Sequence, residues 1–278
     1  MTKLFVTGGT GFIGSNFIHK ALKDGYDIVA VKRAECQKNN LFKEKVVWLT
    51  GELDSQFQKE MSRCDILVHI ASAGVTPQIA DWDECFMSNV IKPLQMLKHC
   101  IQSGISKMVI IGTASEYGLS ASRYNKIPVT AALEPVGAYA SSKCAFFMAA
   151  HGMAVENNIQ LVYLRIFSVY GDGQYEKNLW PSIKKAAISG HNFPMTSGEQ
   201  IRDFICIQEV SKIIVDALNF SLVEPGIPLL KNVGSGKAQT VLQFSQYWWK
   251  QFNATGELLP GVVKYRDNEV MNLVPKLD

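Results

Sequence analysis

The sequence predicts an α/β fold, a doubly wound parallel sheet joined to a smaller C-terminal α/β lobe. Three observations support this fold: apolar runs alternate with helical patterns, a glycine-rich turn follows the first run, and the alternation changes near residue 166. Strands at this spacing pair in parallel, and right-handed crossovers then place helices on both faces of the sheet.

The elements follow one another in a regular order. Apolar runs predict strands over residues 3–6, 27–31, 45–49, 65–70, 107–112 and 160–166. Amphipathic patterns predict helices over residues 12–24, 54–62, 83–102, 137–157 and 176–189. Prolines interrupt the last third, where the elements become short: Pro181, Pro194, Pro225, Pro228, Pro260 and Pro275.

The first strand runs directly into the turn Thr7-Gly8-Gly9-Thr10-Gly11-Phe12-Ile13-Gly14, which opens a helix. Gly8 permits a tight turn, Gly11 lets the backbone approach a pyrophosphate, and Gly14 lets the helix pack on the sheet. The helix N-terminus then faces the anion with free N–H groups. We therefore predict a dinucleotide-binding domain over residues 1–165; a structural turn that is merely rich in glycine is the alternative.

The end of the second strand indicates which dinucleotide binds. NAD-preferring enzymes usually place an acid there, whereas this chain has Lys32 and Arg33. A guanidinium binds a 2′-phosphate that an acid would repel, so we predict NADP(H), with Arg33 the main contact and NAD(H) the alternative. A solvated basic loop continued by Lys38 and Lys43 would also explain these cations.

Two later loops are also expected to line the cofactor site. Glu52 and Leu53 follow the third strand, where a carboxylate could accept from the adenine amino group or be a surface acid. Small residues after the fourth strand, Ala71-Ser72-Ala73, let the backbone lie close to a cofactor. His69 just before them is predicted to be packed and hydrogen-bonded, with no part in catalysis.

Tyr139 and Lys143 lie four residues apart at the start of a predicted helix, so they share one face. A nearby ammonium favours a phenolate, so we expect Lys143 to lower the pKa of Tyr139. Thr113 follows the strand 107–112, where its hydroxyl could donate to a substrate carbonyl. Together these residues indicate hydride transfer at a carbinol carbon, with Tyr139 moving the proton, Lys143 tuning it and Thr113 orienting the oxygen.

These motifs resemble the extended short-chain dehydrogenase/reductase superfamily, from Thr7 to about Val233. The resemblance implies a Rossmann domain, catalysis by Thr113, Tyr139 and Lys143, and a nucleotide-diphosphate sugar as substrate. It implies a lobe formed mainly by residues 166–278, with some segments returning to the first domain. The cofactor-binding residues expected on this basis are Gly8, Gly11, Phe12, Ile13, Gly14, Lys32, Arg33, Glu52, Leu53, Ala71, Ser72, Ala73, Tyr139, Lys143 and Ile166.

The lobe carries the family stretch Arg202-Asp203-Phe204, whose arginine often approaches the sugar-nucleotide diphosphate; a structural ion pair is the alternative. Ser168 replaces the asparagine of many epimerases and dehydratases. Ala114 and Ser115 replace the acid pair of 4,6-dehydratases, and Glu116 is expected to point elsewhere, which disfavours dehydration. The expected substrate contacts are Ser115, Ser168, Trp180 and Arg202, although Trp180 and Phe193 could equally be core aromatics.

The segment from Asn178 to Ile183, followed by the segment from Phe193 to Gln200, is similar to bacterial reductases of 4-keto-6-deoxyhexose nucleotides, including synthases of CDP-abequose and dTDP-fucose-type sugars for O-antigen. The resemblance implies NADPH-dependent reduction of the C4 keto group of a dTDP- or CDP-linked sugar. A C4 epimerase with tightly bound NAD and a non-catalytic dinucleotide-binding regulator are the alternatives.

Composition limits the partners. The net charge of +3 is too small to indicate nucleic acid or a membrane surface, and no apolar run reaches the ~18 residues of a spanning helix. The six cysteines are scattered and the histidines show no metal-ligand spacing, so we expect a reduced cytoplasmic protein without a metal. A homodimer through helices 83–102 and 137–157 is expected from the family, although core packing explains their apolar residues equally well: Phe86, Met87, Met96, Phe146, Met148 and Met153.

Overall fold

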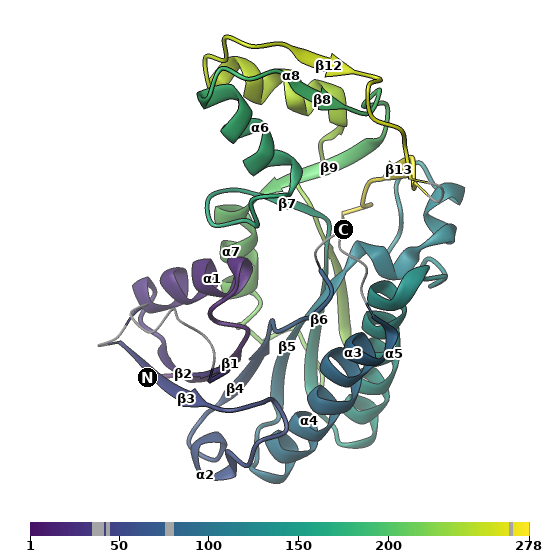
Figure 1. Cartoon of the computed structure of the whole chain (residues 1–278). Helices are drawn as coiled ribbons and strands as arrows, with labels where there is room; N and C mark the ends of the chain where they lie inside the picture. The colour runs from purple at the N-terminus through teal and green to yellow at the C-terminus, as the bar shows by residue number, and fades with distance from the viewer. Residues whose placement is uncertain (35–41, 43–44, 76–80, 267–268, 278) are drawn as a thin grey trace.

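The computed structural model describes residues 1–34, 42, 45–75, 81–266 and 269–277. Its centre is a parallel sheet in the order expected of a doubly wound fold, which confirms the predicted fold class (Figure 1). In sheet order its seven strands are β10 (Leu229–Val233), β6 (Gln160–Ile166), β5 (Lys107–Thr113), β4 (Ile66–His69), β1 (Lys3–Thr7), β2 (Asp27–Lys32) and β3 (Val46–Thr50).

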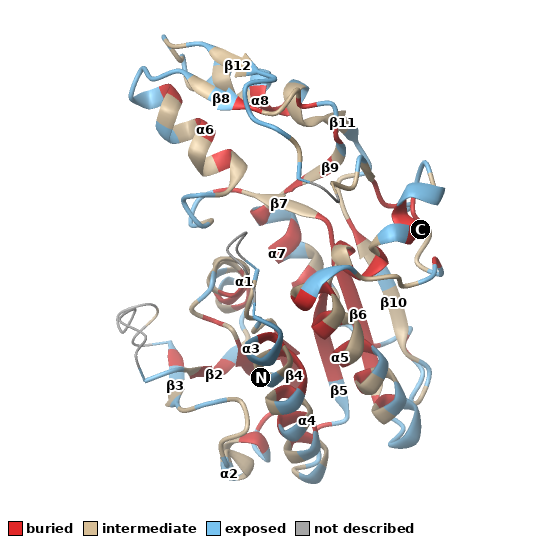
Figure 2. Ribbon diagram, turned by 45° about the vertical axis from the view of Figure 1, so that its right-hand side comes forward, coloured by how far each residue is buried: buried red, intermediate tan, exposed pale blue. Residues whose placement is uncertain are grey.

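Helices cover both faces of this sheet because its central strands are apolar on both sides (Figure 2). On β1, Leu4 and Val6 face a core shared with α1 (Phe12–Lys23) and α7 (Ile207–Asp216). Phe5 points the other way, into a core that contains residues of the helices on the opposite face. These are α4 (Lys92–Gln102) and α5 (Gly137–Glu156).

The predicted segment 83–102 is not one regular helix. It consists of α3 (Trp82–Phe86), a π-helical turn over Met87–Ile91 and then α4. The turn carries Asn89, a buried polar residue that hydrogen-bonds outside the helix. The predicted helix 54–62 is shorter than expected, because only α2 (Gln58–Met61) is helical.

The last third forms a lobe above the carboxyl ends of the sheet strands (Figure 1). Helices α6 (Leu179–Ile188) and α8 (Val241–Gln251) pack together in it. Its strands are β7 (Ser168–Tyr170), β8 (Phe193–Met195), β9 (Ile201–Cys206), β11 (Ala238–Thr240), β12 (Leu258–Pro260) and β13 (Asn272–Leu273). Between lobe segments the chain returns to the first domain, where α7 packs on the sheet and β10 joins it beside β6. The sequence patterns did not predict β10 as a strand. The division at residue 165 stays a prediction.

Candidate active site

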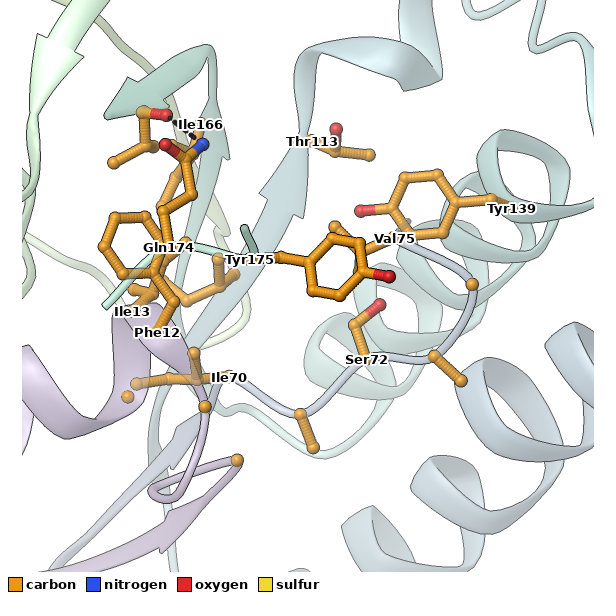
Figure 3. Close-up of a pocket in the computed structure, with 18 of the residues that line it drawn as sticks. Phe12, Ile13, Ile70, Ser72, Val75, Thr113, Tyr139, Ile166, Gln174 and Tyr175 are labelled. Atoms are coloured by element: carbon orange, nitrogen blue, oxygen red, sulfur yellow. Dashed lines mark hydrogen bonds between the residues drawn. The ribbon is translucent and has the colours of Figure 1, made fainter. Parts of the chain in front are cut away.

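A cavity of about 1040 Å³ lies between the carboxyl ends of the sheet strands and the lobe. One side is lined by the loops after β1, β2, β3, β4 and β5. The other side is lined by β7, by the segment that precedes α6, and by α8. Figure 3 shows Phe12 and Ile13 on one side, and Thr113 and Tyr139 on the other. Ligands of doubly wound sheets bind at this edge, so the cavity is the candidate site.

The glycine-rich turn has the shape that a phosphate cradle requires. Gly8 has a φ of +73°, and a Cβ there would lie 2.5 Å from the backbone nitrogen of Ala71. A Cβ on Gly14 would lie 2.1 Å from the Gly8 carbonyl oxygen. Helix α1 begins directly after Gly11, with no acidic residue in its first turn. The turn therefore leaves room for a pyrophosphate at the helix N-terminus, and the contact of these glycines with a dinucleotide stays a prediction.

The adenosine end of this cradle is lined by Lys32, Arg33, Glu52 and Leu53. Arg33 is exposed and directly follows β2. Glu52 Oε2 accepts a hydrogen bond from Lys92 Nζ at 3.0 Å, a partner that the sequence did not suggest. Lys38 and Lys43, which the alternative interpretation of this loop invoked, lie outside the described residues, as does Cys36.

The loop after β4 is held in place by Asn89, which sequence reasoning missed. Asn89 Oδ1 accepts from the Ala73 backbone N–H at 2.8 Å, and its Nδ2 donates to the Ala73 carbonyl at 3.0 Å and to Ser142 Oγ at 3.0 Å. Ala71, Ser72 and Ala73 line the cavity, as expected. A single asparagine within an apolar helical pattern was the available signal.

His69 is packed and hydrogen-bonded, as predicted. Its Nδ1 lies 2.7 Å from Thr7 Oγ1, and its ring meets the Phe146 ring edge-on. Burial, with a smaller contribution from the Lys143 charge, lowers its pKa to about 3. His69 is 1% exposed and does not line the cavity, so it is a structural group.

The structure brings Thr113, Tyr139 and Lys143 together on the cavity wall. Figure 3 shows the Tyr139 phenol pointing into the cavity between Thr113 and Ser72. Thr113 ends β5, and Tyr139 is the third residue of α5. A carbonyl oxygen placed beside Tyr139 could therefore receive hydrogen bonds from two hydroxyl groups.

The expectation that Lys143 lowers the pKa of Tyr139 is wrong for this structure. Burial raises the pKa of the phenol, and the nearby hydroxyls of Thr113 and Ser72 only partly oppose this effect. Lys143 Nζ instead donates to the Ile111 carbonyl at 2.8 Å. Burial lowers the pKa of Lys143 itself to about 8, so it remains a cation at pH 7.

Two of the expected substrate contacts line the cavity, among the described residues: Ser168 and Trp180. The other two are not among the cavity-lining residues. Arg202 Nη2 donates to Glu269 Oε1 at 2.7 Å, which is the alternative structural ion pair. Ser115 lies outside the cavity lining, where its backbone N–H donates to Thr113 Oγ1 at 3.2 Å.

Most aromatic ring contacts of the lobe belong to one packed cluster around Trp180 and Trp248. The Trp180 indole is 7% exposed and meets the rings of Trp248 and Phe252 edge-on, as a core aromatic does, while one edge reaches the cavity. Phe193 is not among the cavity-lining residues and packs near Trp249. Ile166 lines the cavity as expected, and lining residues that sequence reasoning missed include Tyr175, Lys177, Phe204, Phe244 and Arg266.

Other features limit what the site can hold. In the part of the chain that the structure describes, no cluster of three or more His, Cys, Asp or Glu could bind a metal ion. None of the described helices is long and apolar enough to cross a membrane.

A doubly wound sheet, a glycine turn at a helix N-terminus and a tyrosine–lysine helix at the same cavity define a dinucleotide-dependent α/β enzyme. The chain belongs to the NAD dependent epimerase/dehydratase family, whose model matches residues 4–227. This confirms the resemblance that the motifs indicated.

Individual relatives are distant. A CDP-abequose synthase from Salmonella muenchen is 24% identical over 277 residues, covering 97% of this chain and 87% of that protein. A UDP-glucose 4-epimerase from Azospirillum brasilense is 27% identical over 263 residues, covering 86% and 74%. The solved structure of UDP-N-acetylglucosamine 4-epimerase from Methanobrevibacter ruminantium M1, in complex with UDP-N-acetylmuramic acid, has a TM-score of 0.88 at 21% identity, covering 99% of this chain and 89% of that one. At this identity the likeness establishes the fold.

Proposed function

We propose that this protein reduces the C4 keto group of a nucleotide-diphosphate 4-keto-6-deoxyhexose, dTDP- or CDP-linked, with NADPH as the hydride donor. The observation that carries the proposal is the placement of Thr113, Tyr139 and Lys143 on the wall of one cavity that also reaches Lys32 and Arg33. The match to a CDP-abequose synthase over nearly the whole chain supports the substrate class.

The residues of the site divide the chemistry. When bound, the reduced nicotinamide supplies a hydride to the carbonyl carbon. Thr113 and Tyr139 donate hydrogen bonds to the carbonyl oxygen, and Tyr139 then transfers its proton to that oxygen. Its raised pKa keeps Tyr139 protonated at pH 7, which suits a proton donor. Lys143, one helical turn away on the same cavity wall, is a cation that could donate a hydrogen bond to the ribose of a bound nicotinamide nucleotide.

The phosphate preference follows from the end of β2. Arg33 is exposed and lines the cavity, where its guanidinium could bind a 2′-phosphate. The glycine turn contains no acidic residue that would repel this phosphate. We therefore propose NADP(H) as the cofactor, within a family described as NAD dependent.

Replacing Tyr139 with phenylalanine tests the reaction. The ring keeps its packing and only the hydroxyl is lost, so NADPH binding should survive while turnover falls by about 10²–10⁴-fold. Turnover is measured by the fall in NADPH absorbance with dTDP-, CDP-, GDP- and UDP-linked 4-keto-6-deoxyhexoses. Tyr175→Phe is the matched control, because it removes another phenol of the same cavity. Near-normal turnover of the Tyr139 variant would contradict the assignment.

The alternative of a C4 epimerase is favoured by the relatives named UDP-glucose 4-epimerase. An epimerase would retain its dinucleotide during purification and interconvert two sugars without net NADPH consumption. A non-catalytic regulator would leave the NADPH absorbance unchanged with every sugar nucleotide. The same screen therefore separates the three functions.

We also propose a cytoplasmic homodimer. Met96 and Phe146 belong to the core, which corrects the idea that they face a partner. Met87 and Met148, in contrast, are 48% and 60% exposed. Met148→Glu should convert a dimer to monomers in light scattering, and an unchanged mass would refute this interface.

A further inference from the structure

A buried carboxylate, Glu116, lies directly behind the wall that carries Thr113. Its Oε1 accepts hydrogen bonds from the Thr113 backbone N–H at 2.9 Å and from the Tyr163 hydroxyl at 2.7 Å. Its Oε2 accepts from Arg165 Nε at 2.7 Å. The Glu116 side chain is 0% exposed and does not line the cavity, so it cannot touch a ligand there.

Arg165, the charge partner of Glu116, is committed to the protein interior. Its guanidinium carbon lies 4.4 Å from the centroid of the Phe147 ring and 5.2 Å from that of Tyr117. Its Nη1 donates to the Val129 carbonyl at 3.2 Å. Pairing with Arg165 alone would satisfy one carboxylate oxygen, and the other is used to hold Thr113.

The contact with Thr113 reaches the catalytic phenol in two steps. Glu116 and Thr113 form a reciprocal cap on the short 3₁₀ turn Ala114–Tyr117. This cap fixes the backbone at Thr113, and the Ser115 backbone N–H donates to Thr113 Oγ1 at 3.2 Å, which fixes the direction of the hydroxyl. The Thr113 and Tyr139 hydroxyls then lie on the same side of the cavity (Figure 3).

The charge of Glu116 also acts on the site. The ionisable groups that face it are Tyr139, Lys143 and Cys144 on α5, Tyr163 and Arg165 on β6, and the adjacent Tyr117. Burial lowers the pKa of Lys143, and the Glu116 charge opposes this effect. The same charge raises the pKa of Tyr139. Both effects hold protons on the catalytic pair.

We propose that Glu116 is a positioning residue: its buried carboxylate fixes Thr113 on the cavity wall that also carries Tyr139, and its negative charge acts on the Tyr139–Lys143 pair from behind that wall. The proposal rests on the proton-donor function proposed above for Tyr139. Glu116 follows directly after Ala114 and Ser115, the two positions that carry the acid pair in 4,6-dehydratases. The proposal gives this displaced acid a structural role beside the site.

Glu116→Gln tests the charge, because the amide oxygen can still accept from the Thr113 N–H. The alkaline fall in kcat should move to lower pH by about one unit. The ultraviolet absorbance change on ionisation of Tyr139, taken as the difference from matched Tyr139→Phe proteins, should move in the same direction. This second readout needs no substrate, so an inactive wild type would refute the proposed function while still testing Glu116.

Two further variants separate positioning from stability. Tyr163→Phe removes one hydrogen bond to the same carboxylate but keeps its charge, so the pH profile should be unchanged. Because Glu116→Gln leaves Arg165 unpaired, Glu116→Gln/Arg165→Gln removes both buried charges and should show the same direction of change. Unchanged kcat and phenolate profiles in a folded Glu116 variant would overturn the proposal. Failure of both Glu116 variants to fold would assign the carboxylate to stability alone and also overturn it.

Discussion

Replacing Lys143 with methionine should stabilise the protein at neutral pH while removing most of its turnover. Burial lowers the pKa of Lys143 from 10.5 to about 8. A lysine whose folded-state pKa is lowered destabilises the folded state fully at pH values below that pKa, and the effect disappears as the pH rises toward 10.5. The difference between the unfolded-state and folded-state pKa of Lys143 corresponds to about 3 kcal/mol of folding stability lost at pH 7.

Methionine is an unbranched side chain of similar length, so it should fill the same space. The variant loses the hydrogen bond from the Nζ ammonium to the Ile111 carbonyl, and a hydrogen bond from a charged group contributes about 2 kcal/mol. We therefore expect a net gain of about 1 kcal/mol in the free energy of unfolding at pH 7. This gain should shrink to nothing or change sign by about pH 10.5.

Urea denaturation at pH 7 and near pH 10 measures both the size and the pH dependence of the effect. Lys59→Met, on an exposed position of α2, is the matched control and should change stability little at either pH. A Lys143 variant that is less stable at pH 7, or a gain that does not decrease as the pH rises, would refute the argument that burial penalises this charge.

Two other substitutions test the cofactor half of the cavity. Arg33→Ala should raise the KM for NADPH about 10–100-fold in initial-rate assays and change the KM for NADH little, because one charge-assisted contact with the 2′-phosphate is lost. Arg63→Ala is the exposed control. An equal effect on the KM of both cofactors would refute the phosphate contact. Asn89→Leu should lower the free energy of unfolding by about 2–4 kcal/mol and weaken dinucleotide binding in calorimetry, because the Ala73 backbone loses both of its hydrogen bonds to the asparagine. Unchanged dinucleotide binding would mean that other contacts hold the loop.

Much of the fold follows from local pattern. The six predicted strands agree with the observed ones to within a residue at most ends, because strands buried on both faces are short continuous apolar runs. Strand β10 was not predicted, since Lys231 and Asn232 interrupt its apolar pattern and, among the described residues, it pairs only with β6. Edge strands of this kind depend on tertiary pairing more than on their own residues.

The site was predicted unevenly for a similar reason. The glycine turn and the Tyr139–Lys143 pair have fixed spacings, so the sequence alone locates them. The direction of the pKa of Tyr139 could not be predicted, because it depends on how deeply the ring is buried. The partner of Arg202 was also beyond the sequence, since Glu269 is distant in the chain and only the folded lobe brings the two together.

The return of the chain to the sheet as β10 has a consequence for biosynthesis. The ribosome makes residues 1–166, which carry six of the seven sheet strands, before it makes the lobe and β10. Until residue 233 has emerged, the edge of β6 has no neighbour and can pair with a strand of another nascent chain. The catalytic helix is therefore synthesised well before its sheet is closed, and this interval is when a chaperone would be most useful to the protein.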